Sequence, residues 1–130
     1  MASPTAEIDG SAAAALEAYC AQFAARRAEA LADLFAEHAL VEIPLLDHHV
    51  RGAEVVPTLT AIVSTLDACE VTLKSVVAAG STAMGEGQLV AQTSNGGLDF
   101  DFAIVVQVDD DGRIVRLSEY FDTDPIKPLD

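Results

Sequence analysis

One carboxylate stands out in the last segment that alternates as a strand does. Between Arg113 and Asp122, Glu119 shares one side of the alternation with Val115, Leu117 and Phe121. Because burial disfavours the charged form of a carboxyl, we expect the pKa of Glu119 to rise toward the range useful for proton transfer at neutral pH. Glu119 is therefore the first candidate for a catalytic acid or base. In the alternative interpretation the strand is solvated on both faces and Glu119 pairs with a surface Lys or Arg.

A tyrosine on an apolar helix face is the second candidate. Tyr19 recurs with Leu16, Cys20 and Phe23 at helical spacing. Its phenol could donate a hydrogen bond to an oxyanion that develops during a reaction. Alternatively, Tyr19 is a core residue whose hydroxyl reaches the edge of the core. Glu42 is a reserve acid if the first strand is shifted by one residue.

Metal binding has little support in the sequence. Asp47, His48 and His49 are adjacent, but neighbouring residues of an extended segment point in opposite directions. The two cysteines, Cys20 and Cys69, belong to no Cys/His ligand cluster and are expected to be buried thiols. We therefore expect neither a metal nor another cofactor.

The first half of the chain has the spacing of helices. Ser11 is a plausible N-cap after an N-terminal arm of residues 1–10, and Leu31, Leu34 and Phe35 repeat the apolar pattern. No Gly or Pro separates the stretches before and after Arg26-Arg27, so one long helix and two short helices both fit. A short strand over residues 40–45 and a second short strand near residue 51 should follow.

A further helix is expected from close to Val55 to near Asp67, with Pro57 in its first turn, where proline is tolerated. After it the pattern changes to long strands that are joined by short Gly-, Asn- and Asp-rich turns, so consecutive strands should be antiparallel neighbours. These strands are Cys69–Ala79, Thr82–Thr93, Leu98–Val108 and Arg113–Asp122. The sequence therefore predicts an α+β domain, with N-terminal helices packed on a curved, mostly antiparallel sheet.

Two strands carry features that bear on a ligand. Glu86 and Gln88 alternate with Gly85 and Gly87, so this strand either bends close to a ligand or turns its polar residues to solvent. The next strand has an uninterrupted apolar face along residues 98–108, which belongs to a core or a pocket. If that face were open it would need cover, and a homodimer through the sheet face is the expected cover.

Composition limits the partners. The 130 residues fit one core, and 7 Lys plus Arg against 21 Asp plus Glu give a formal net charge of −14. This charge repels phosphate backbones and anionic membrane surfaces, so we expect neither nucleic acid nor a membrane as a partner. No stretch approaches the roughly 18 apolar residues of a membrane-spanning helix, and we expect a cytoplasmic protein.

The stretch YCAQFAARRAEALADLFAEHALVEIP from Tyr19 to Pro44, then Arg51-Gly52 and the closing DGRIVRLSEYFD, resembles one superfamily over nearly the whole chain. This is the nuclear transport factor two-like superfamily, which includes SnoaL-like polyketide cyclases, limonene epoxide hydrolases and ketosteroid isomerases. The resemblance implies a SnoaL-like domain over residues 11–123, followed by a tail at 124–130. It also implies a cone-shaped sheet around an apolar pocket.

Carrying the family's functional residues over gives a mixed result. Tyr19 matches the oxyanion-hole tyrosine of ketosteroid isomerases, but their base falls on Ile43 and their second oxyanion donor on Ile104. The catalytic aspartate of the epoxide hydrolases matches Glu119, but residues 85–92, GEGQLVAQ, lack the Arg and Asp that those enzymes also use. SnoaL-like cyclases are the most similar, since they rely chiefly on one aspartate at the position of Glu119.

The resulting hypothesis is a SnoaL-like enzyme that binds an apolar carbonyl compound and performs an aldol-type cyclisation or an isomerisation, with Glu119 as acid/base and Tyr19 bonded to the oxygen. Its alternatives are a non-catalytic binding module for an apolar small molecule and an epoxide hydrolase-like activity. The expected pocket residues are Leu16, Phe23, Ile43, His49, Ile104, Leu117 and Phe121.

Overall fold

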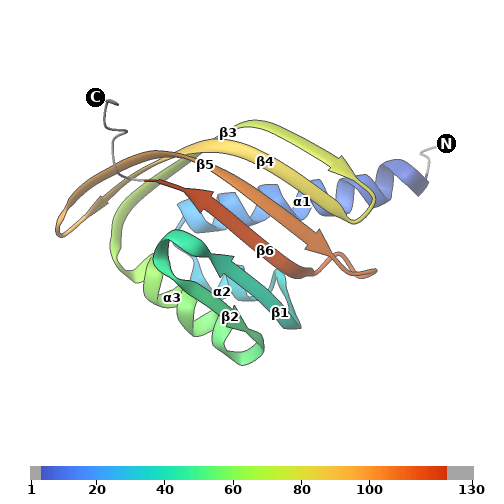
Figure 1. Ribbon diagram of the computed structural model, residues 1–130, viewed down its shortest axis with the longest axis horizontal. Coiled ribbons are helices and arrows are strands. Elements are labelled where there is room, and N and C mark those ends of the chain that lie inside the picture. Colours follow the sequence, from blue (N-terminus) through green and yellow to red (C-terminus); the bar gives the residue numbers. More distant parts are fainter. Residues whose placement is uncertain (1–3, 123–130) are drawn as a thin grey trace, which may run out of the picture.

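The computed structural model describes residues 4–122, and the side chains from Ser11 onward. Helices come first and a long antiparallel meander closes the chain (Figure 1). The expected tail at 124–130 lies outside the described residues. The helices and strands are α1 (Pro4–Ala24), α2 (Ala28–Ala32), β1 (Phe35–Ile43), β2 (His48–Arg51), α3 (Val55–Ser64), β3 (Leu66–Ala79), β4 (Thr82–Thr93), β5 (Gly96–Val108) and β6 (Ile114–Phe121), with 3-10 turns at Pro44–Leu46 and Gly52–Glu54.

A six-stranded sheet with the order β2-β1-β6-β5-β4-β3 is the backbone of the fold. Neighbouring strands are antiparallel except for β1 and β6, which are parallel. The sheet curves, α1 packs against β3, β4 and β5, and α3 lies beside α2 near the other end of the sheet (Figure 1). The predicted α+β architecture is confirmed.

The N-terminal helical region consists of two helices that break at Arg26. This residue has a φ of 58°, a left-handed conformation that ends α1. Its guanidinium donates hydrogen bonds to the carbonyl oxygens of Leu66, at 3.3 Å, and Asp67. The side chain therefore ties the end of α1 to the start of β3. Helix α1 begins at Pro4, so Ser11 lies within the helix and the expectation that it is the N-cap is wrong.

Strand boundaries differ from the expectation where apolar residues fit both periodicities. The apolar spacing predicts Phe35 in a helix, but Phe35 opens β1, and β3 begins at Leu66, earlier than the expected Cys69. Thr82–Thr93 coincides with β4 as expected. The loop before β6 is stabilised by Asp109, whose Oδ1 accepts hydrogen bonds from the backbone N–H groups of Asp111 and Arg113.

The glycines of β4 allow close packing on the inner face of the sheet. A Cβ added at Gly87 would lie 2.5 Å from the Thr72 carbonyl oxygen and 2.9 Å from the Phe102 ring. The alternate residues Glu86 and Gln88 point to the other face, where Ser75 Oγ donates to Glu86 and Gln88 Nε2 donates to an aspartate of β5. The glycines thus serve packing, and the polar residues between them lie away from the interior.

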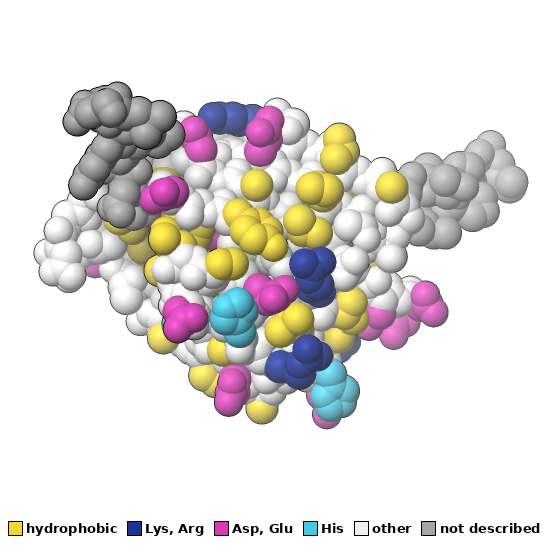
Figure 2. Space-filling view, viewed as in Figure 1, with side chains coloured by type: hydrophobic (Ala, Val, Ile, Leu, Met, Phe, Trp, Pro, Cys, Tyr) yellow, Lys and Arg dark blue, Asp and Glu magenta, His cyan; other side chains and the backbone are white. Residues whose placement is uncertain are grey.

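The outer face of the sheet is not the apolar face that we expected to need cover. The even-numbered residues 102–108 of β5 are buried under the helices. The outer face instead exposes Val77 by 66%, Met84 by 51% and Tyr120 by 47%, and hydrophobic side chains gather over its strands in Figure 2. The homodimer through the sheet face stays a prediction. In the part of the chain that the structure describes, no helix is long and apolar enough to cross a membrane.

We expect Gly87→Ala to lower the free energy of unfolding by about 1–3 kcal/mol, because the new methyl group must displace backbone as well as an aromatic ring. Urea denaturation measures the change. Gly97→Ala is the matched control, since the nearest atoms to its Cβ belong to the Gln92 side chain at 3.3 Å, which can move. Equal effects of the two substitutions would contradict the close approach at Gly87.

Candidate functional site

Strand pairing places Glu119 between two isoleucines on the inner face of the sheet. On one side β5 pairs Ile104 with Glu119. On the other side the parallel register of β1 and β6 pairs Glu42 with Ser118, so the next residues, Ile43 and Glu119, lie side by side. Ile43 and Ile104 are both nearly inaccessible to solvent. The carboxylate therefore has apolar neighbours on both flanking strands.

This environment changes the acidity of Glu119. Burial raises the pKa of Glu119 to about 7, and the nearby Tyr19 hydroxyl opposes part of the rise. Among the described residues no Lys or Arg forms an ion pair with Glu119. The pairing with a surface cation that the alternative interpretation required is therefore not seen in residues 4–122. A carboxyl with this pKa exchanges protons readily at neutral pH.

Behind Glu119 is a small inner chamber of about 10 Å³, roughly the space of one water molecule. Tyr19 of α1 reaches it with a side chain that is 2% exposed. Burial first, and then the charge of Glu119, raise the pKa of Tyr19 well above its usual value, so the phenol stays protonated. The chamber is lined by Tyr19, Cys20, Phe23, Val71, Leu89, Phe102 and Glu119.

The Tyr19 hydroxyl is close enough to Glu119 for each group to alter the pKa of the other. The hydroxyl has no hydrogen-bond partner among the described residues. The hydroxyl is thus a buried donor that is available to an oxygen atom in the chamber. Cys20 is inert there, because burial raises the pKa of its thiol to about 12.

In front of Glu119 is an open cavity of about 950 Å³, which is within the range of ligand pockets. Glu119, Phe23 and Leu89 belong to both spaces, so the carboxyl stands at the boundary between the chamber and the cavity. The lining is mainly apolar and contains no Lys or Arg among the described residues. Its residues are Phe23, Ile43, Leu45, Leu46, His48, Pro57, Thr58, Ala61, Ile62, Thr65, Leu66, Leu89, Leu98, Phe100, Glu119 and Phe121.

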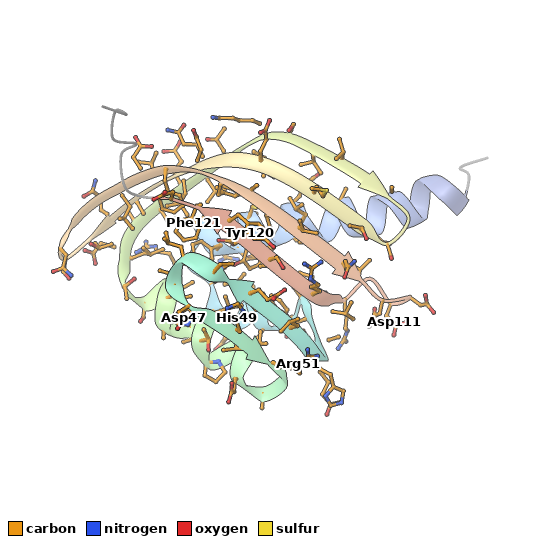
Figure 3. All side chains as sticks on the ribbon, viewed as in Figure 1. Asp47, His49, Arg51, Asp111, Tyr120 and Phe121 are labelled. Carbon is orange, nitrogen blue, oxygen red and sulfur yellow. The ribbon has the colours of Figure 1, made fainter. Side chains whose placement is uncertain are left out.

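Glu42 and His49, both expected at the site, lie on the outer face of the sheet. Glu42 accepts hydrogen bonds from Ser118 Oγ at 3.1 Å and from Arg116 Nε at 3.4 Å, and His49 Nδ1 is 3.7 Å from its other oxygen. The Ser118 hydrogen bond, then Arg116 and His49, lower the pKa of Glu42. Figure 3 shows His49 on the face of β2 toward the viewer, opposite to the helices. This cluster ties β1, β2 and β6 together and does not reach the cavity.

The other expected pocket residues divide into two groups. Phe23, Ile43 and Phe121 line the cavity, and Phe121 stacks on Phe100 with ring centroids 4.4 Å apart. By contrast, three are fully packed in the core and reach neither space: Leu16, Ile104 and Leu117.

His48 and the helix α3 are parts of the cavity wall that the sequence did not predict. Thr58, Ala61, Ile62 and Thr65 line the cavity, and their spacing of three and four residues was a signal that could have identified one face of α3. For His48, only the hairpin register decides that it points inward while His49 points outward. Residues 4–122 contain no cluster of three or more His, Cys, Asp or Glu side chains that could hold a metal ion.

A curved sheet with helices on one face, around a mainly apolar cavity with one partly buried carboxyl, is the architecture of nuclear transport factor two-like proteins. The SnoaL-like domain family matches residues 16–117, and the chain belongs to this family. No curated protein matches the sequence.

Solved structures with the same fold have low sequence identity. An NTF2-like protein from Anabaena variabilis is 17% identical with a TM-score of 0.81, covering 95% of this chain and 96% of its own. An LEH-like epoxide hydrolase from M. tuberculosis is 21% identical with a TM-score of 0.76, covering 88% and 84%. A protein with a ketosteroid isomerase-like fold from Catenulispora acidiphila is 16% identical with a TM-score of 0.73, covering 82% and 83%. At these identities the likeness shows the fold alone.

The pKa of Glu119 predicts how stability depends on pH. Folding raises it from the ordinary 4.5 to about 7, so the folded state binds this proton more tightly than the unfolded chain does. The stability linked to Glu119 is fully present below about pH 4.5 and is lost as the pH rises through about 7. We therefore expect Glu119→Gln to gain stability relative to the parent chain as the pH rises from 5 to 8, measured by urea denaturation. A difference that does not change with pH would contradict the raised pKa.

Proposed function

We propose that this protein is a small-molecule enzyme that transfers a proton on an apolar carbonyl compound, with Glu119 as the acid/base. The observation that carries the proposal is the position of Glu119 at the boundary of the cavity and the chamber, with a pKa of about 7. A base with this pKa is half ionised at neutral pH. It can therefore accept a proton from carbon and return it in the next step.

The two spaces suit the two parts of a ketone. The chamber accepts one oxygen atom, to which the Tyr19 hydroxyl donates a hydrogen bond, and the apolar body of the compound fills the cavity. Ionised Glu119 takes the proton from the carbon beside the carbonyl. The C–H electron pair forms a C=C bond, and the C=O π pair moves to the oxygen, giving an enolate that Tyr19 stabilises.

The proton on Glu119 then decides the product. In an isomerisation the substrate carries a C=C bond beside the deprotonated carbon, so the enolate is a conjugated dienolate and the proton returns to its far carbon. In an aldol-type cyclisation the enolate carbon attacks a second carbonyl of the same molecule, and the alkoxide that forms takes the proton from Glu119. Both routes restore ionised Glu119, and neither needs a group that the chain does not supply.

The composition of the lining favours proton transfer over the competing activities. Among the described residues that line the cavity, Glu119 is the only carboxylate and no Arg accompanies it, whereas the family's epoxide hydrolases use an Arg and a further Asp. A non-catalytic binding module would use the same apolar wall but would not need an acid with a pKa near neutrality.

Exchange of α-protons for deuterium tests the proposal without knowledge of the product. We expect the protein to accelerate exchange of 2-tetralone, an uncharged apolar ketone, in D₂O followed by proton NMR. Glu119→Gln should lower the catalysed rate by about a hundredfold or more. Glu42→Gln is the matched control and should keep the rate, because Glu42 lies on the outer face. Binding of the ketone without accelerated exchange would contradict the proposal and support a binding module.

The pH profile provides a second test. For the parent protein we expect the exchange rate to rise with pH through about 7, since ionised Glu119 is the base. Tyr19→Phe should shift this midpoint to higher pH, because the nearby Tyr19 hydroxyl lowers the pKa of Glu119, and should also reduce the limiting rate. An unshifted midpoint in Tyr19→Phe would show that the two groups do not interact.

A further inference from the structure

His48 is a polar group in the cavity wall to which the proposed chemistry gives no role. It begins β2 directly after the turn at Pro44–Leu46, and its side chain lines the cavity. Within the described residues, no hydrogen bond or ion pair engages its imidazole. An imidazole in a mainly apolar wall therefore keeps its hydrogen-bonding capacity for whatever occupies the cavity.

The position of His48 relative to Glu119 follows from the strand register. β2 pairs His48 with Ile43, and Ile43 lies beside Glu119 on β6, so the three residues form a row across the inner face of the sheet. Adjacent strands are about 4.8 Å apart, which separates the backbones of His48 and Glu119 by about 10 Å. The apolar side chain of Ile43 occupies the interval.

Glu119 and His48 thus mark two polar ends of a mainly apolar cavity, and the other polar groups of the wall are two threonines. Thr58 and Thr65 of the α3 region line the same cavity, but the Thr65 hydroxyl is already bonded to the Ile62 carbonyl oxygen at 2.7 Å. α3 packs against β2, the strand of His48. No Lys or Arg in the described lining offers a fixed positive charge to an anion.

We propose that the cavity selects an elongated, uncharged compound with an oxygen at each end, one at Glu119 and Tyr19 and the other hydrogen-bonded to His48. His48 is then the specificity-determining residue for the far end of the substrate. The proposal rests on the proposed function for the identity of the reacting end of the substrate. It adds a second oxygen at the other end, bound to a residue whose backbone lies about 10 Å from that of Glu119.

A matched pair of rigid probes tests the proposal by binding alone. 4,4′-Dihydroxybiphenyl carries a hydroxyl at each end of an apolar body, and 4-hydroxybiphenyl lacks one of them. With dissociation constants measured by calorimetry at pH 8, we expect the parent protein to bind the diol about fivefold more tightly, the worth of one net hydrogen bond. 4′-Hydroxybiphenyl-4-carboxylate should bind more weakly than the diol, because its charge has no cationic partner.

His48→Leu should abolish the preference for the diol and leave the affinity for 4-hydroxybiphenyl within about twofold. His49→Leu is the matched control and should keep the preference, since this neighbouring histidine pairs with Glu42 on the outer face. A preference that persists in His48→Leu, equal affinities of the two probes for the parent protein, or no binding of either probe would each overturn the assignment.

The assay needs no turnover, so it separates the two proposals. Loss of the diol preference in His48→Leu, together with no catalysed exchange of 2-tetralone, would retain the two-ended site and reject the proton-transfer function. Catalysed exchange without a diol preference would do the reverse.

Discussion

The parallel pairing of β1 with β6 is the constraint on which the site depends. It inserts β1 between the last strand of the meander and β2, and so it sets Ile43 against the carboxyl of Glu119. Without this strand Glu119 would lie near a sheet edge and be open to water, with an ordinary acidity. The same pairing carries His48 onto the inner face, because β2 is hydrogen-bonded only through β1.

The two faces of these strands have opposite electrostatic characters. On the inner face Glu119 forms no ion pair with a Lys or Arg of the described residues, and burial raises its pKa. On the outer face, one residue earlier on each strand, Ser118 and Arg116 surround Glu42 and lower its pKa. Two glutamates on adjacent strands thus differ in acidity because the alternation of side chains sends one to an apolar cavity and the other to a polar, solvated cluster.

Close packing at the other end of the sheet supports the cavity. Gly87 lets β4 approach Phe102 at a distance that a Cβ would not permit, and a Cβ at Gly85 would be tight against Leu16 at 3.3 Å. Arg26, at the end of α1, bonds to the carbonyl oxygens that begin β3 and so fixes α1 near the cavity wall at Leu66. These contacts hold Tyr19 next to Glu119 although one hundred residues separate them in sequence.

The sequence by itself determined the α+β architecture, the meander and the candidacy of Glu119 and Tyr19. Period-two alternation and turn residues encode those features locally. Only the tertiary structure decided which spaces the side chains share. His48 rather than His49 faces the cavity, Glu42 faces outward, and α3 supplies part of the wall. The physical reason is that a one-residue change of strand register reverses every side chain, and the register of β1 against β6 is set by packing between segments far apart in the chain.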